Sequence, residues 1–295
     1  MSTDRGSWWR DGAVIEFLQQ FDDPTFYLIM RLFSFLGDEP FYLFALPVLF
    51  WCWDKRKAWP LAIVLGLEFY LNFVLKEAFH SPRPLGTALV EAEGFGFPSG
   101  HAQNGVVLWG YLAWATRSNF GLAGMVVFLV GLSRLYLGVH FPSDVVGGWA
   151  LGFLWLIICL YVMNELKRRQ FAMPTVPGIA LVFLLSFWLM GIYLNEMSIK
   201  IGAAVSGFVA GVMVERSYVG FDSGGAWLIQ GKKVLLGIAG VLLIKEGLGF
   251  FFPDTVPLHY LRYGSVGLWI GLGAPWMFVR LKLGKVESVV GKNRQ

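Results

Sequence analysis

Long apolar stretches separated by short polar segments make up most of this 295-residue chain. Each stretch is close to the roughly 20 residues that an α-helix needs to cross the apolar interior of a bilayer. The candidate spans are 38–53, 57–79, 99–118, 120–138, 144–165, 173–195, 197–215, 233–252 and 261–281. The pattern therefore predicts an all-α, polytopic transmembrane helix bundle of about nine spans. Residues 24–37 are read as either an interfacial helix or a tenth span.

The composition agrees with this pattern. The chain is 56% hydrophobic and only 15% charged, against about 25% charged residues in an ordinary soluble domain. The N-terminal residues mix charges throughout and lack the features of a cleaved signal peptide. Cys52 and Cys159 both fall within predicted helices, where they indicate neither a disulfide framework nor a zinc site. The composition thus excludes a soluble globular protein.

The positions of the basic residues predict which side of the membrane each loop faces. Most of the 24 Lys and Arg residues lie in alternate loops on one side, which the positive-inside rule makes cytoplasmic. The N-terminus, the loop 80–98, "GVHFPSD" and "FFPDTVPLHYLR" then face outward. The net charge of +4 reflects this asymmetry, so no nucleic-acid partner is expected.

Three polar clusters border the outward loops. They are "KEAFHSPRP" at 76–84, "PSGH" at 98–101 and "SRLYLGVHFPSD" at 133–144. Each has an ordinary explanation when taken alone: cationic side chains snorkel at helix ends, and Pro-Ser is a common helix start. Because isolated charges are costly in a bilayer, three clusters at one face favour a functional site.

The residue types within two of these clusters indicate their chemistry. The start of a helix at Ser99 leaves unpaired N–H groups that suit an anion. Gly100 lets an oxygen approach closely, and His101 stands beside that position. In the third cluster, Asp144 follows His140 by four residues and is close enough to accept an imidazole N–H. A carboxylate in that place fixes the tautomer and leaves the other ring nitrogen free as a nucleophile or base.

The three clusters together resemble the signature KxxxxxxRP, PSGH, SRxxxxxHxxxD of the type 2 phosphatidic acid phosphatase superfamily. The match is complete and in order, and the resemblance covers roughly residues 70–165. Within it, "LNFVLKEAFHSPRP" and "SRLYLGVHFP" are most similar to the glucose-6-phosphatase and sphingosine-phosphate phosphatase branch. The resemblance implies a membrane phosphatase whose catalytic helices lie at the outward face.

The resemblance also implies a role for each matching residue. His140 would attack phosphorus to give a phosphohistidine, Asp144 would orient it, and His101 would protonate the leaving oxygen. The groups implied to bind the phosphate are Lys76, Arg83, Ser99, Gly100 and Arg134. No cluster is rich enough in carboxylates for a magnesium or calcium site, so neither a metal nor another cofactor is expected.

The expected organisation follows from these assignments. Residues 1–37 are an N-terminal amphipathic or interfacial segment, 38–165 the catalytic transmembrane core, and 166–295 further transmembrane helices with a basic cytoplasmic tail. The partners expected are a lipid phosphate, with one phosphate or two, and membrane lipids. A soluble sugar phosphate as substrate remains an alternative, as does a non-catalytic lipid-binding or transport protein.

Some other positions carry a structural interpretation. Asp38, close before Pro40, is read as a helix cap, and His80 as ordinary loop packing. Gly207 and Gly211 form a small-xxx-small face, which packs helices either within the fold or in a homo-oligomer. The sequence leaves these two alternatives open.

Overall fold

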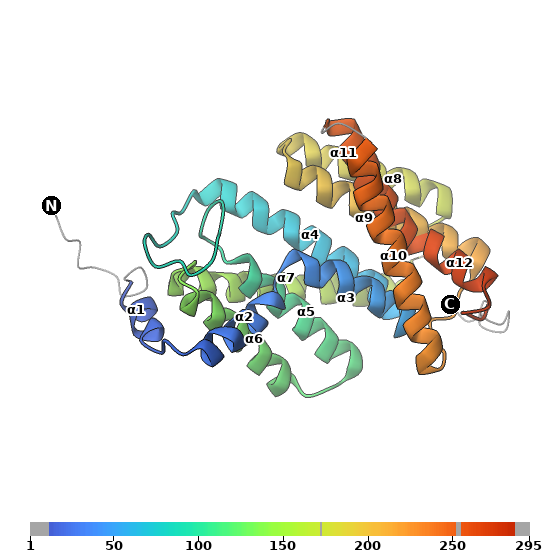
Figure 1. The fold of residues 1–295 in the computed structure, drawn as a ribbon. Coiled ribbons are helices and arrows are strands. Elements are labelled where there is room, and N and C mark those ends of the chain that lie inside the picture. The colour runs from blue at the N-terminus through green and yellow to red at the C-terminus, as the bar shows by residue number, and fades with distance from the viewer. Residues whose placement is uncertain (1–11, 172, 252–254, 287–295) are drawn as a thin grey trace. The chain divides into compact units, whose positions relative to one another are not determined.

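Helices make up nearly all of the regular structure in this computed structural model, which describes residues 12–171, 173–251 and 255–286. Within those ranges the only β pairing is an isolated bridge between Phe221 and Val286. The helices are α1 (Ala13–Gln19), α2 (Pro24–Phe35), α3 (Glu39–Cys52), α4 (Lys55–Phe79), α5 (Gly100–Thr116), α6 (Phe120–Tyr136), α7 (Pro142–Arg168), α8 (Thr175–Ile192), α9 (Glu196–Val214), η1 (Glu215–Val219), α10 (Trp227–Phe251), α11 (Val256–Leu268), η2 (Trp269–Gly273) and α12 (Ala274–Arg280) (Figure 1). The prediction of an all-α protein is confirmed.

The chain divides into two compact units. The first contains the residues up to Tyr42 together with Leu71–Tyr161, and the second contains Leu43–Tyr70 together with the residues from Val162 onward. The division falls within α3, α4 and α7, so each of these helices contributes one end to each unit. All three polar clusters of the sequence belong to the first unit.

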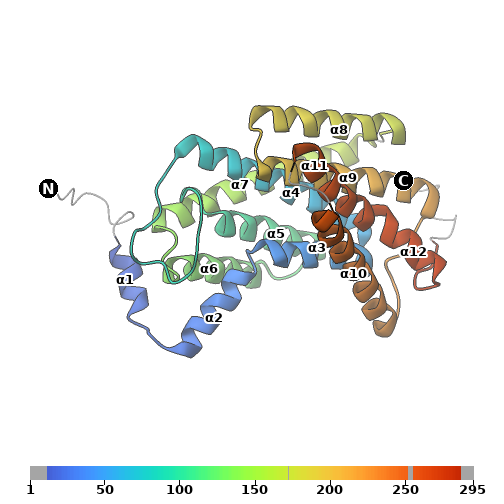
Figure 2. The ribbon, with the colours of Figure 1, turned by 45° about the horizontal axis from the view of Figure 1, so that its top comes forward.

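Local sequence signals explain the helix ends in the first unit. Helix α5 begins directly after Ser99 and ends at Arg117, whose left-handed φ of 54° stops the helix. Two residues later, the side chain of Asn119 accepts a hydrogen bond from Gly121 N at 2.7 Å and caps α6. The short connection makes α5 and α6 neighbours, and they lie side by side in both views (Figure 1, Figure 2).

Glycines on α7 bring its backbone close to α5. A Cβ at Gly148 would lie 2.6 Å from Ser99 O, and one at Gly152 would lie 2.6 Å from Gln103 O. Such distances are shorter than van der Waals contact, so any side chain at either position would push the two helices apart. The start of α7 is therefore held against the start of α5, where two of the three clusters meet.

In the second unit, α9 packs on α11 through backbone contacts. A Cβ at Gly207 would overlap Gly264 O, and one at Gly211 would lie 3.1 Å from Leu272 N. Of the two alternatives that the sequence leaves open for this glycine face, packing within the fold is the one observed. Because α11 and η2 lie directly against Gly207 and Gly211, there is no room for a second copy of the chain to pack on these two glycines.

The second unit also buries two lysines. Lys55 Nζ lies 3.0 Å from Glu215 Oε1 and also donates to Phe221 O. Lys233 is completely buried, and its Nζ donates to Ser223 O at 3.2 Å and to Gly224 O at 2.9 Å. Each ammonium is thus paired with oxygens, as a buried charge must be.

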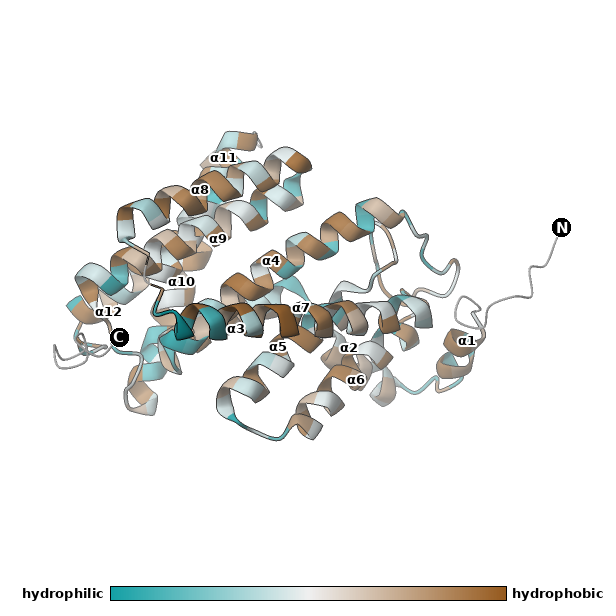
Figure 3. Cartoon of the chain, turned by 180° about the vertical axis from the view of Figure 1, so that it is seen from behind, coloured by the Kyte–Doolittle hydropathy of each residue, from teal (hydrophilic) through white to brown (hydrophobic). Residues whose placement is uncertain are grey.

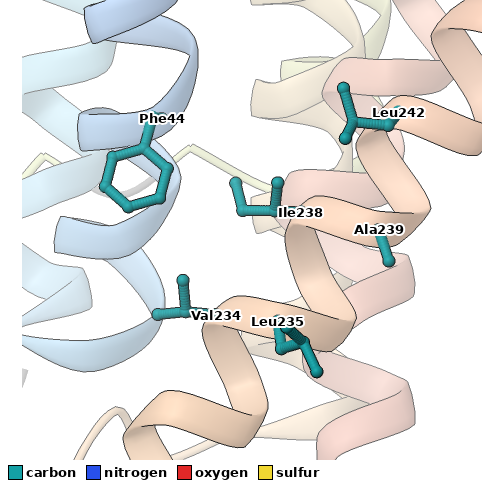
Figure 4. Close-up of a pocket in the computed structure, with 6 residues that line it drawn as sticks. All are labelled: Phe44, Val234, Leu235, Ile238, Ala239 and Leu242. Atoms are coloured by element: carbon teal, nitrogen blue, oxygen red, sulfur yellow. The ribbon is translucent and has the colours of Figure 1, made fainter.

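An apolar pocket of about 320 Å³ lies between α3 and α10 within the second unit. Figure 4 shows Phe44 from α3 on one side, with side chains of α10 on the other. The residues that line it are Phe44, Val234, Leu235, Ile238, Ala239 and Leu242. All of the described residues that line this pocket are apolar, so it suits an apolar occupant such as part of a lipid chain.

Fewer helices pass as membrane spans than the expected nine. Among the described residues, α4, α7, α8, α9 with η1, and α10 are long and apolar enough, and α2 with α3 forms a sixth candidate bent by 55°. Figure 3 shows apolar residues along the length of α8. Helices α5 and α6 have 17 residues each, which gives about 25 Å against a bilayer core of about 30 Å. The count of nine is not confirmed.

Candidate active site

The first cluster anchors the loop 80–98. Lys76, in the last turn of α4, donates from Nζ to Phe95 O at 2.5 Å and to Gly96 O at 3.4 Å. Because both acceptors are main-chain carbonyls, neither neutralises the ammonium charge. His80 packs its ring against Phe95, with 4.4 Å between ring centroids, which agrees with its interpretation as loop packing.

Arg83 makes contacts through all three nitrogens of its guanidinium, two of them within the same loop. Nε donates to Gly94 O at 3.0 Å, and Nη2 donates to Glu93 O at 2.8 Å. Nη1 donates to Val139 O at 2.9 Å and lies 3.2 Å from His140 Nε2. The fork geometry of arginine makes these contacts possible at once. Arg83 therefore connects the first cluster directly to the histidine of the third.

The second cluster is held in place by the main chain of the third. Ser99 N donates to Asp144 O at 2.9 Å. The Ser99 side chain is completely buried, makes no capping hydrogen bond, and its Oγ has no hydrogen-bond partner among the described residues. Gly100 is equally constrained, because a Cβ there would lie 3.0 Å from Asn72 Oδ1. A buried hydroxyl and uncapped N–H groups thus stand together at the start of α5.

His140 and Asp144 form a buried pair. Their side chains are only 2% and 1% exposed, and Nδ1 lies 3.5 Å from Asp144 Oδ2. The same oxygen accepts a hydrogen bond from Phe141 N at 3.0 Å, which fixes the carboxylate at the start of α7. Since a guanidinium only donates, the contact with Arg83 requires a lone pair on His140 Nε2. The proton of a neutral ring then sits on Nδ1, facing Asp144.

Burial and nearby cations act on His140 in the same direction. Burial is the main reason why the pKa of His140 lies well below its usual range, and the positive charges of Arg134, Arg83 and Lys76 lower this pKa further. Both effects disfavour the imidazolium form. The ring is therefore neutral at physiological pH, the state in which Nε2 is a nucleophile.

The remaining two predicted residues have partners at the end of α2 and on the turn that follows it. His101 Nε2 lies 2.8 Å from Asp38 Oδ1. Arg134, which is 6% exposed, contacts the hydroxyl of Ser34 through Nη1, while its Nε has no hydrogen-bond partner in the described part of the chain. Arg134 therefore keeps a buried donor for another ligand.

All eight predicted residues thus come from one unit. Direct contacts link Arg83 to His140 and tie Ser99 to Asp144. Lys76, Arg134 and His101 are near enough to act electrostatically on His140. The arrangement gathers three cations, a buried hydroxyl and a helix start around one neutral imidazole. A tetrahedral dianion such as a phosphate ester has the complementary charge and geometry.

Ser34 and Asp38 were not predicted as site residues from the sequence. Asp38 directly precedes α3, as its interpretation as a cap requires, but its carboxylate contacts His101. No local pattern reveals such a pairing, because 63 residues separate the two side chains. The one available signal was an acidic residue at the outward end of a predicted span.

Comparison with known proteins identifies the family of this chain. Residues 57–168 match the PAP2 superfamily, and residues 199–286 match the transmembrane extension of PAP2 superfamily phosphatases. The chain belongs to the PAP2 superfamily. The first match includes all three clusters, and the second includes most of α9 and all of α10, α11 and α12.

Three relatives illustrate the range of this family. Phosphatidylglycerophosphatase B of Bacillus subtilis is 35% identical, over 38% of this chain and 63% of the relative. Lipid phosphate phosphatase delta of Arabidopsis thaliana is 30% identical, over 70% of this chain and 58% of the relative. Sphingosine-1-phosphate phosphatase 2 of Homo sapiens is 30% identical, over 53% of this chain and 43% of the relative. The chain therefore spans less than two thirds of the length of each.

Proposed function

We propose that this PAP2 protein is an integral-membrane phosphatase that hydrolyses a lipid phosphate through a phosphohistidine intermediate. The observation that carries the proposal is the contact of His140 with Arg83, because it requires an unprotonated Nε2 and puts that atom beside a cation that can bind phosphate. The names of the three relatives support a lipid phosphate as the substrate class.

In the first step, His140 Nε2 attacks phosphorus, the N–P bond forms and the P–O bond to the leaving group breaks. Asp144 Oδ2 faces Nδ1 and stabilises the positive charge that the ring acquires. A proton donated by His101 converts the leaving oxygen into an alcohol. In the second step, water attacks phosphorus, the N–P bond breaks and inorganic phosphate is released.

The other residues of the cluster hold the phosphoryl oxygens. Arg83 and Arg134 supply guanidinium donors, Lys76 supplies charge, and Ser99 Oγ and the Gly100 N–H supply neutral donors. Such fixed donors stabilise a phosphoryl transition state more than covalent chemistry does. Since charge is already provided by three side chains, we propose that the reaction requires no metal ion.

We also propose that the site faces the extracytoplasmic side, because the positive-inside rule assigns the basic loops to the opposite, cytoplasmic side. A test is cysteine labelling from outside the membrane, in a protein that lacks Cys52 and Cys159. A Leu85→Cys variant, at a position 93% exposed, is expected to react from the outside. A Lys232→Cys variant, at an exposed position, is expected to react from the cytoplasmic side only. The reverse pattern would overturn the orientation.

The substrate class is tested with purified protein and a panel of phosphate esters. Phosphatidylglycerophosphate, phosphatidic acid and sphingosine 1-phosphate are compared with glucose 6-phosphate in one detergent. A long-chain lipid phosphate is expected to show much the higher kcat/KM, because its apolar chains add hydrophobic binding energy. Equal kcat/KM on glucose 6-phosphate would favour a soluble sugar phosphate, and no turnover of any ester would favour a lipid-binding protein.

A further inference from the structure

The contact between Asp38 and His101 joins distant parts of the first unit. Asp38 Oδ1 lies 2.8 Å from His101 Nε2, and the two side chains are 34% and 21% exposed. The signature assigns a catalytic role to one carboxylate, that of Asp144, and Asp38 lies outside all three clusters. The contact therefore adds a group to the site that the signature does not contain.

The turn that carries Asp38 fits closely against the imidazole. A Cβ at Gly37 would lie 2.5 Å from His101 Cδ2 and 2.7 Å from its Cγ. The turn is itself held by main-chain hydrogen bonds from Gly37 N to Ser34 O at 2.9 Å and from Asp38 N to Phe35 O at 3.1 Å. Glycine at position 37 thus lets a rigid turn lie against the ring and bring the carboxylate to Nε2.

The contact determines which nitrogen of His101 is free. An ionised carboxylate only accepts hydrogen bonds, so the ring must carry its proton on Nε2 when it is neutral. The other nitrogen, Nδ1, is then the one that exchanges a proton with substrate or water. His140 has the opposite arrangement, with Nδ1 facing its carboxylate and Nε2 reactive.

The charges around His101 explain why it needs a carboxylate. Burial is the main effect that disfavours a positive charge on the ring, and Arg134 and Arg83 act in the same direction from nearby. Asp38 is the acidic group that opposes them. A proton donor must be protonated when substrate binds, so the carboxylate supplies the charge that keeps this form accessible.

We propose that Asp38 is the positioning residue of His101, and that the pair first protonates the leaving group and then deprotonates the attacking water. The proposal rests on the function proposed above. In the first step the Nδ1 proton moves to the leaving oxygen as the P–O bond breaks and the bond from His140 Nε2 to phosphorus forms. In the second step a water proton returns to Nδ1 as the new P–O bond forms and the N–P bond breaks. Protons and charges balance over one turnover.

The test uses Asp38→Asn, which keeps an acceptor oxygen but removes the charge. Alkyl phosphates need a protonated leaving group, whereas aryl phosphates with acidic phenols need little help. The variant is expected to lose about 10- to 100-fold in kcat/KM on a lipid phosphate, part of the roughly 10²- to 10⁴-fold that general acid–base catalysis supplies. On p-nitrophenyl phosphate the loss in kcat/KM is expected to be about threefold or less.

A second readout follows from the water step. With p-nitrophenyl phosphate, the variant is expected to release one equivalent of phenol quickly and then turn over slowly, with phosphohistidine accumulating on His140. The alkaline limb of its pH profile on the lipid phosphate is expected to shift to lower pH, because the imidazolium loses its counter-ion. Asp38→Glu, which restores the carboxylate, is expected to recover most of the activity and serves as the second variant if Asp38→Asn does not fold.

Two control variants separate positioning from general damage. Asp23→Asn makes the same change at the other end of α2, where Asp23 accepts from Phe26 N at 2.9 Å: it removes the charge and keeps an acceptor oxygen, and it is expected to leave both activities unchanged. Ser34→Ala removes the partner of Arg134 and is expected to reduce kcat/KM equally on the lipid phosphate and on p-nitrophenyl phosphate.

Two results for Asp38→Asn would overturn the proposal. One is an equal loss on both substrates with an unchanged pH profile, and the other is no loss at all. His140→Ala is measured alongside, because its retained activity would instead refute the proposed function.

Discussion

The contacts of Arg83 lead to a quantitative prediction for Arg83→Lys, which keeps the charge but removes the fork. The bonds to Glu93 O and Gly94 O are exposed and contribute little. The two contacts of Nη1, with Val139 O and His140 Nε2, are partly buried. A lysine ammonium is a single point of charge, so it cannot reproduce this pair together with a contact to phosphate.

The expected magnitude follows from the donor that Arg83 offers to phosphate and from its hydrogen bond to Val139 O. Loss of one preorganised donor to a developing oxyanion costs about 2.7–4 kcal/mol, or about 10²- to 10³-fold in kcat. Loss of the charged hydrogen bond to Val139 O costs about 1.5–3 kcal/mol of stability. We therefore expect kcat/KM to fall by at least about 100-fold while the protein still folds.

The assay measures inorganic phosphate released from a lipid phosphate in detergent, over a range of substrate concentrations. Arg168→Lys is the matched control, since Arg168 is also bonded through its guanidinium, to Glu165, but its side chain is 75% exposed. It is expected to retain wild-type activity. An Arg83→Lys protein within twofold of wild type would show that charge alone suffices and that the fork has no catalytic role.

Three further outcomes are expected. His140→Ala abolishes phosphohistidine formation, measured by trapping with ³²P-labelled substrate, while the protein still inserts in the membrane; a labelled variant would contradict the assignment. In the pH profile of kcat/KM, the acid limb lies below the ordinary histidine pKa of about 6.5, because the lowered pKa of His140 keeps the ring neutral to lower pH. An acid limb at or above about 6.5 would contradict the assignment of His140 as the nucleophile. Activity persists in excess chelator and is inhibited by vanadate, whereas recovery only on adding magnesium would refute the proposed metal independence.

Local patterns were sufficient where the structure is itself local. Asp144 lies in the first turn of α7 and His140 just before that helix, so a spacing of four residues is enough to bring the two side chains close together. The start of α5 after Ser99 also follows from local signals. The apolar stretches likewise predicted an all-α fold, because a helix satisfies its own main chain within an apolar phase.

Long-range contacts and helix breaks were not accessible from the sequence. Ser34 meets Arg134 across 100 residues, and Asp38 meets His101 across 63. An apolar window also does not reveal where a helix stops. The predicted span 261–281 is interrupted by the π-helical turn η2, and the predicted span 99–118 begins with the polar residues of the site. The interruption at η2 and the short helices α5 and α6, of 17 residues each, account for the three predicted spans that are not found among the described residues.

The buried Lys233 has a practical consequence for experiments on the intact protein. Its neighbour Lys232 is exposed, while Lys233 is completely enclosed and bonded to main-chain carbonyls. An amine-reactive reagent will therefore modify Lys232 in the folded protein and reach Lys233 only after the second unit opens. Mass spectrometry of the peptide that contains both lysines would report, from the ratio of the two modifications, what fraction of a purified preparation is correctly folded.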